Sequence, residues 1–132
     1  MSGIVVAWSP DVYGRAALEA ALVEAHRRGV GVVVVNSTKG DALVDDSYAS
    51  RVQLAEVEAL IAAADVPHEV RQTMGNDIAE QVLAVADETA AEMVVIGLRR
   101  RSPVGKLIMG STAQRVLLGA HCPVLAVKPG GG

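Results

Sequence analysis

Aromatic residues are almost absent from this sequence: they make up 2% of its 132 residues, and phenylalanine does not occur. Proteins that bind single-stranded nucleic acids stack the bases on aromatic side chains, so this composition argues against nucleic acid as a partner. Hydrophobic residues nevertheless make up 51% of the chain, which excludes a disordered protein. The core must therefore consist of Val, Ile, Leu and Ala, which suit buried parallel strands and the helices that cover them.

The sequence has a single cysteine, Cys122, which excludes a disulfide framework and a cysteine-rich zinc site. Its surroundings, HCPVLAVK, favour a small buried hydrophobic residue. No basic segment followed by an apolar one opens the chain, and no apolar run approaches the roughly 18 residues of a membrane span. We therefore expect a soluble, cytoplasmic protein that has no membrane partner.

Histidine, like cysteine, is scarce in this sequence. The histidines His26, His68 and His121 do not lie at the spacing of metal ligands, so we expect no metal site built from them. Asp11 and the acidic residues of 41–46 leave Mg²⁺ open as an ion beside bound phosphates. Helix caps and solvated loop charges are the alternative explanation for the same acidic residues.

Short apolar runs alternate with amphipathic segments along the whole chain. The patterns predict strands at 3–8, 30–36, 68–74, 92–97 and 122–128, and helices at 15–28, 47–64, 75–90 and 111–120. This alternation predicts right-handed crossovers and a mainly parallel sheet with helices on both faces. We expect one domain over residues 1–129, followed by a flexible tail at 130–132.

In sheets of this kind, ligands bind beyond the carboxyl ends of the strands. The loops WSPD, NSTK and GLRRR…GST follow the first, second and fourth predicted strands, so we expect them to share one site. The third loop is also the most basic part of the chain. Residues 93–132 contain six basic residues and no acidic one, whereas residues 1–92 contain 15 acidic and six basic residues. This uneven distribution favours a local anion site over a generally basic surface.

The stretch IGLRRRSPVGKLIMGST indicates how an anion could be held. Gly110, Ser111 and Thr112 begin the last predicted helix, with Ser111 as the expected N-cap, and the free N–H groups of a helix N-terminus favour an anion. A solvated loop before an ordinary serine cap explains the same residues. The standard nucleotide loops are absent, because Arg100 and Leu107 replace the residues that a P-loop requires and no G-x-G-x-x-G follows a strand.

The longer stretch VVIGLRRRSPVGKLIMGSTAQRVLLGAHCPVLAVK resembles the C-terminal signature of the universal stress protein family, which reads G-x2-G-x9-G-[ST] in its ATP-binding members. Gly97, Gly110 and Ser111 match this signature, and Arg100 replaces its second glycine. The opening IVVAWSPDVYGRAALEAAL resembles the first strand and helix of the family, so the resemblance covers nearly the whole chain. It implies an open five-stranded parallel sheet in the order 3-2-1-4-5, a Rossmann-like fold of the adenine-nucleotide α-hydrolase type.

The resemblance also implies a site for ATP or a related adenine nucleotide, such as ADP, AMP or cyclic AMP. The residues that fall at the family's binding positions are Trp8, Ser9, Asn36, Ser37, Gly97, Arg99, Arg100, Gly110, Ser111 and Thr112. Ser9 stands where binding members usually carry an aspartate near the adenine, and Trp8 packs either against a ring or in the core. Asn36 and Ser37 end the second strand, where family members meet adenine mainly through the main chain. Arg100 either adds a phosphate contact or, if the glycine conformation is needed, costs about 1–2 kcal/mol.

The resemblance implies a regulatory protein of stress or metabolic signalling that forms a homodimer. Residues 123–128 form an apolar strand at the expected sheet edge, which would pair with its copy. No nucleophile and base converge on the expected site, so we expect no enzymatic activity beyond weak ATP hydrolysis. Two alternatives stay open: a nucleotide-free dimeric interaction module of the same family, motivated by Ser9 and Arg100, and a small enzyme of the same architecture.

Overall fold

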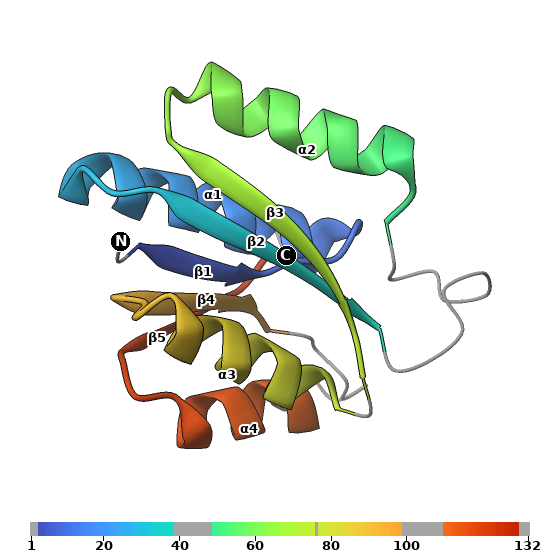
Figure 1. Ribbon diagram of the computed structural model, residues 1–132, viewed down its shortest axis with the longest axis vertical. Coiled ribbons are helices and arrows are strands. Elements are labelled where there is room, and N and C mark those ends of the chain that lie inside the picture. Colours follow the sequence, from blue (N-terminus) through green and yellow to red (C-terminus); the bar gives the residue numbers. More distant parts are fainter. Residues whose placement is uncertain (1–2, 39–48, 76, 99–109, 130–132) are drawn as a thin grey trace.

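The computed structural model describes residues 3–38, 49–75, 77–98 and 110–129 (Figure 1). Its strands are β1 (Ile4–Ala7), β2 (Val32–Thr38), β3 (His68–Met74), β4 (Met93–Gly97) and β5 (Val124–Val127). Its helices are α1 (Val12–Arg28), α2 (Arg51–Ala63), α3 (Ile78–Glu88) and α4 (Ser111–Gly119). All the predicted elements are therefore confirmed in their predicted order, with ends that differ by a few residues. The expected tail lies outside the described residues.

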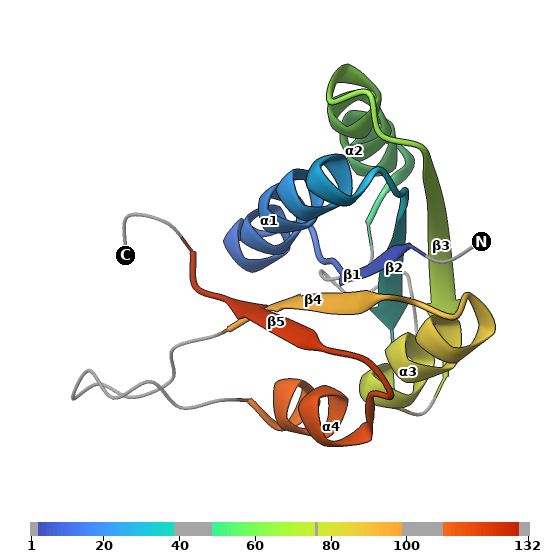
Figure 2. The same ribbon diagram turned by 90° about the vertical axis from the view of Figure 1, so that its left-hand side faces the viewer.

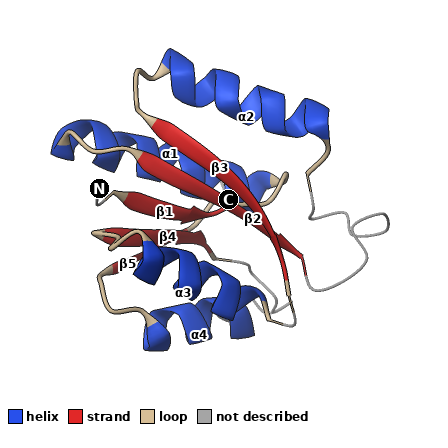
Figure 3. Cartoon of the chain, viewed as in Figure 1, coloured by secondary structure: helices blue, strands red, loops and turns tan. Residues whose placement is uncertain are grey.

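The strands form one parallel sheet in the order β3-β2-β1-β4-β5, as the resemblance implies (Figure 3). The chain builds outward from β1 to one edge and then returns to build the other half. Strand order therefore reverses between β1 and β4. Helices α1 and α2 cover one face of the sheet, and α3 and α4 cover the other (Figure 2).

Alternation along the strands divides the core into two layers. Ile4, Val6 and Trp8 belong to the layer under α1 and α2, whereas Val5 and Ala7 belong to the layer under α3 and α4. Both layers are dry at the centre, since Val5 and Val6 are fully buried. This explains why the first two strands are apolar throughout instead of alternating with polar residues.

The helix N-termini are not all capped in the same way. The side chains of Asp11, Ser50 and Asp77 accept hydrogen bonds from the first turns of α1, α2 and α3, respectively. The expected cap of α4, Ser111, is wrong: Ser111 is the first helical residue, and Gly110 occupies the cap position with no side-chain hydrogen bond. Gly110 is extended, and its carbonyl accepts the N–H of Gln114, so the helix begins one residue earlier than the serine cap would require.

Within the described residues, no helix is both long enough and apolar enough to cross a membrane.

Candidate functional site

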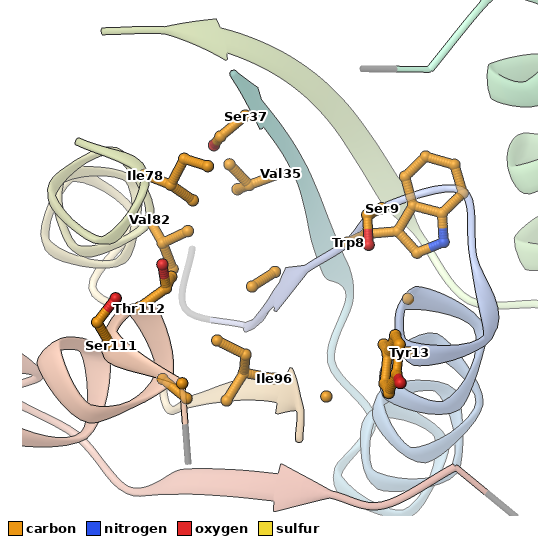
Figure 4. A pocket seen from close by; sticks show the side chains of 15 residues that line it. Trp8, Ser9, Tyr13, Val35, Ser37, Ile78, Val82, Ile96, Ser111 and Thr112 are labelled. Atoms are coloured by element: carbon orange, nitrogen blue, oxygen red, sulfur yellow. The ribbon is translucent and has the colours of Figure 1, made fainter. Parts of the chain in front are cut away.

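A pocket of about 180 Å³ opens at the carboxyl ends of the central strands, where strand order reverses (Figure 4). Its apolar lining includes the strand residues Ala7, Val35 and Ile96 and the α3 residues Ile78 and Val82. The rest of the lining comes from the end of β1 and the start of α1, from the ends of β2 and β4, and from the N-terminus of α4: Trp8, Ser9, Tyr13, Gly14, Ser37, Gly97, Gly110, Ser111, Thr112 and Ala113. The three loops that the sequence analysis assigned to one site therefore do contribute residues to a common pocket.

The alternation of β2 decides which of its last residues face the pocket. Val35 and Ser37 line the pocket, whereas the side chain of Asn36 lies fully buried and outside its lining. The Asn36 Nδ2 donates to the carbonyl of Trp8 at 3.1 Å, and its Oδ1 accepts from the main-chain nitrogen of Ala49 at 2.7 Å and from Gln72 at 3.1 Å. Asn36 therefore ties β1, β3 and the start of α2 together from the opposite side of the sheet.

Trp8 also lies at the boundary between pocket and core. It is among the lining residues, but it is only 8% exposed and belongs to the core layer under α1 and α2. Figure 4 shows its indole directed away from the side chains of Ile78 and Val82. The indole therefore packs in this core layer, while Trp8 also contributes to the pocket wall.

Ser9 stands at the rim, and its hydroxyl donates to the carboxylate of Asp11 at 2.9 Å. The same carboxylate accepts the main-chain N–H groups of Tyr13 and Gly14 at 3.1 and 2.9 Å. Asp11 is therefore a helix cap, as in the alternative explanation for this acidic residue. No group of three or more His, Cys, Asp or Glu side chains that could hold a metal occurs in the described part of the chain, and residues 41–46 lie outside it.

Two glycines let the first turn of α1 approach the strand ends. A Cβ on Gly14 would lie 1.8 Å from the Ser9 carbonyl oxygen, and a Cβ on Gly97 would lie 2.6 Å from the Tyr13 carbonyl oxygen. Both contacts are far closer than real side chains allow. Gly97, the first glycine of the sequence signature, is therefore required by packing, whatever it contributes to a ligand.

The N-terminus of α4 is the polar end of the pocket. Gly110, Ser111 and Thr112 line it, and within the described residues no side-chain hydrogen bond caps the helix. The first N–H groups of an α-helix have no carbonyl partner within the helix, and together with the helix dipole they form a site that attracts anions. Arg99 and Arg100, which the resemblance places at the same site, lie outside the described residues.

A line of hydrogen bonds beside the pocket was not predicted from the sequence. Ser37 Oγ lies 2.7 Å from Thr73 Oγ1, which donates to Gln81 Oε1 at 2.6 Å, and Gln81 Nε2 donates to the Thr38 carbonyl at 3.2 Å. Thr73 is the direct neighbour of Ser37 in the parallel register of β2 and β3. That register, together with the position of Gln81 one turn into α3, is the signal that could have revealed the network.

The lining of the pocket contains no charged side chain among the described residues. The pKa shifts that the structure produces lie elsewhere. Burial, assisted by the Asp87 carboxylate, raises the pKa of the Cys122 thiol, and hydrogen bonds to Glu69 and Glu88 raise the pKa of Arg71. The described part of the pocket therefore offers hydroxyl groups, main-chain groups and apolar surface instead of carboxylate, imidazole or basic side chains.

Comparisons with known proteins agree on one family. A sequence model of the universal stress protein family matches residues 1–128. A universal stress protein from Mycolicibacterium smegmatis is 50% identical over 128 residues, which are 97% of this chain and 98% of that protein. The structure of a universal stress protein from Archaeoglobus fulgidus superposes with a TM-score of 0.83 at 33% identity, covering 97% of this chain and 99% of that one. The universal stress protein from Archaeoglobus fulgidus in complex with dAMP superposes with a TM-score of 0.77 at 28% identity, covering 97% of this chain and 98% of that one.

Proposed function

The chain belongs to the universal stress protein family, and on this premise we propose that its pocket binds an adenine nucleotide. The observation that carries the proposal is the coincidence of two findings. A relative that shares the fold over 97% of this chain was solved in complex with dAMP, and this chain has a pocket at the reversal of strand order, where such sheets bind ligands.

The two ends of the pocket suit the two ends of a nucleotide. Val35, Ile78 and Val82 offer an apolar surface to a flat base. The N-terminus of α4, whose cap residue Gly110 has no side chain, offers N–H groups to a phosphate. In Figure 4, the side chains of Ile78 and Val82 lie between Ser37 and the pair Ser111 and Thr112, so base and phosphate have separate places.

The proposed role is regulatory, in stress or metabolic signalling, with ATP, ADP, AMP or cyclic AMP as the ligand. We propose no enzymatic activity beyond weak ATP hydrolysis, which fits a described lining without carboxylate or imidazole groups. Mg²⁺ would then arrive with the phosphates of ATP. Turnover that disappears when Arg99, Arg100 and Ser111 are together replaced by alanine would instead favour the enzyme alternative.

The proposal extends to assembly and location. We propose a homodimer through residues 123–128, which is supported by the position of β5 at the edge of the sheet and by the partial exposure of all its residues. We also propose a cytoplasmic location. Light scattering at micromolar concentration should give twice the mass of one chain. A monomeric mass contradicts this part of the proposal.

Calorimetric titration with ATP, ADP, AMP and cyclic AMP tests the central claim. Ser111→Asp places a carboxylate at the proposed phosphate end, where an acidic residue in the first helical turn does not destabilise the helix. We expect this variant to bind AMP at least tenfold more weakly than Ser111→Asn, the neutral control of nearly the same shape. Adenosine, which lacks the phosphate, should bind both variants equally.

No binding of any of these nucleotides at millimolar concentration overturns the proposal. That outcome would favour the nucleotide-free interaction module, whose specific support is the exposed edge strand β5 and the replacement of the family's aspartate by Ser9.

A further inference from the structure

Three polar side chains from different elements meet at the end of the pocket away from α4. Ser37 comes from β2, Thr73 from β3 and Gln81 from α3, and hydrogen bonds of 2.7 and 2.6 Å join them in that order. A third hydrogen bond, of 3.2 Å, joins Gln81 to the main-chain carbonyl of Thr38. Ser37 is the member of this chain of hydrogen bonds that lines the pocket, and it is 7% exposed.

The direction of every proton in this chain follows from its last member. A main-chain carbonyl can only accept, so the Gln81 group that faces Thr38 must be the amide nitrogen. The amide oxygen of Gln81 therefore faces Thr73 and accepts its hydroxyl proton. A hydroxyl has one proton, so Thr73 has none left for Ser37, and Ser37 must donate to Thr73.

The hydroxyl of Ser37 is thereby committed. An isolated serine can turn its proton toward a ligand, but this one has already donated it, and this is its one hydrogen bond among the described residues. What Ser37 offers to the pocket is lone pairs only. Among the described lining residues beside it, the side chains of Val35 and Ile78 are apolar, so Ser37 supplies the side-chain hydrogen-bonding group at this end of the described pocket.

Resting on the adenine-nucleotide binding proposed above, we propose that Ser37 is a specificity-determining residue that selects a purine with an amino group at position 6. The N–H of that amino group donates to Ser37. A 6-oxo purine, such as hypoxanthine or guanine, presents an acceptor at the same place, and two acceptors without a proton between them repel. Thr73 and Gln81 are positioning residues that act through Ser37.

The geometry of a nucleotide places the relevant edge of the base near Ser37. Position 6 of a purine lies on the side of the base away from the glycosidic nitrogen, which carries the sugar and the phosphate. With the phosphate at the N-terminus of α4, the 6-substituent points toward the opposite end of the pocket. Figure 4 shows Ser37 at that end, beyond Ile78 and Val82 as seen from Ser111.

AMP and IMP provide the sharpest test, because they differ only at the base edge in question. We expect the unmodified protein to bind AMP at least tenfold more tightly than IMP, since an unpaired buried acceptor is costly. Ser37→Ala should weaken AMP binding and bring the AMP-to-IMP ratio of affinities close to one. Calorimetry or competition against a fluorescent adenine nucleotide measures both constants.

Substitutions of the positioning residues Thr73 and Gln81 should change the preference for AMP over IMP, which a purely structural role would leave unchanged. Thr73→Val removes the acceptor of the Ser37 proton at nearly constant volume, so Ser37 becomes free to donate to a 6-oxo group. We expect IMP to bind more tightly to this variant than to the unmodified protein, while AMP changes by less than twofold. Gln81→Met should act in the same direction from α3, and it serves if Thr73→Val fails to fold. Thr89→Val is the matched control, because Thr89 bonds to its own helix and does not line the pocket.

The outcomes separate this inference from the proposed function. Equal binding of AMP and IMP by the unmodified protein, or a ratio that survives Ser37→Ala, overturns the role of Ser37 and leaves nucleotide binding standing. A ratio that Thr73→Val and Gln81→Met leave unchanged overturns the committed proton of Ser37. If neither AMP nor any other adenine nucleotide binds, the proposed function and this inference fall together.

Discussion

The two faces of the sheet differ at the carboxyl ends of the strands. Under α1 and α2, the strand ends are filled by the indole of Trp8 and the bonded amide of Asn36, and Asp11 caps the adjacent helix α1. Under α3 and α4, the neighbouring strand residues are Ala7 and Ser37, a pocket remains, and no side chain among the described residues caps α4.

This difference arises between adjacent residues of the same strands. Because successive side chains point to opposite faces, one strand can close the core with one residue and open a site with the next. Trp8 and Asn36 supply bulk and hydrogen bonds to the filled face, which holds the strand ends in place. The pocket face needs that support, since Ala7 and Ser37 fill little space at the strand ends. Stability should therefore respond most to substitutions on the face under α1 and α2, and binding to substitutions on the face under α3 and α4.

The largest effect is expected from emptying the filled face with Trp8→Ala. Loss of a large buried aromatic side chain destabilises a protein by about 3–5 kcal/mol, because the cavity that it leaves collapses only in part. Urea unfolding measures the free energy of unfolding. The fraction that stays folded in the absence of urea should bind AMP within twofold of the unmodified protein. A tenfold loss of affinity at unchanged stability would instead place the indole in the binding site.

The second-largest loss of stability is expected from Asn36→Ala, which removes both the donor and the acceptor of the buried amide. The Trp8 carbonyl and the Ala49 N–H lose their partner, and each buried unpaired group costs about 1–3 kcal/mol. We expect a loss of about 3 kcal/mol in the free energy of unfolding, by the same measure. Gln72→Ala, the comparison variant, removes the part-buried hydrogen bonds that Gln72 donates to Asn36 and to the Ala49 carbonyl, and it should cost less than half as much. Equal losses for the two variants would show that Asn36 has no special place among these hydrogen bonds.

The layered fold could be predicted from the sequence, and the assignment of residues to its faces could not. Alternating apolar and amphipathic segments suffice to predict an α/β sheet, and the resemblance adds the strand order. The first strands, however, are apolar on both sides, so their pattern does not tell which residue faces which layer. Asn36 and Ser37 therefore looked equivalent, although only Ser37 lines the pocket.

The residues of the site that could not be predicted from the sequence were hidden for a related physical reason. Thr73 and Gln81 enter the network through the register of β2 against β3 and through the place of α3, and both are tertiary relations without a local signal. The predicted serine cap was wrong for a local reason: Gly110 is extended and occupies the cap position, so α4 begins at Ser111. Gly97 was predicted to lie in the site, but its packing against Tyr13 required the structure.

A smaller effect on stability, combined with a clear effect on binding, is expected from Ile78→Ala in the pocket face. The side chain is only partly buried and borders a space that is already open, so we expect a loss of about 1 kcal/mol in the free energy of unfolding. The affinity for AMP should fall about tenfold, because the base loses an apolar wall. Leu83→Ala is the control on the same helix: it is also partly buried but does not line the pocket. An equal loss of affinity in both variants would assign the effect to helix α3 as a whole.

The smallest change in stability is expected when α4 is made to resemble α1 by Gly110→Ser. The backbone at Gly110, with φ of −65° and ψ of 158°, is open to any residue, so the substitution brings no strain. A serine at this position can accept an N–H from the first turn, as Ser50 does in α2, and a cap of this kind gains only a few tenths of a kcal/mol over glycine. The same hydrogen bond occupies a group that a phosphate would use. We therefore expect a slightly higher melting temperature together with weaker binding of AMP and unchanged binding of adenosine. Gly110→Ala adds a Cβ without an acceptor and is the control for size. If serine and alanine weaken AMP binding equally, crowding explains the loss, and the open N-terminus of α4 is not what distinguishes the two faces.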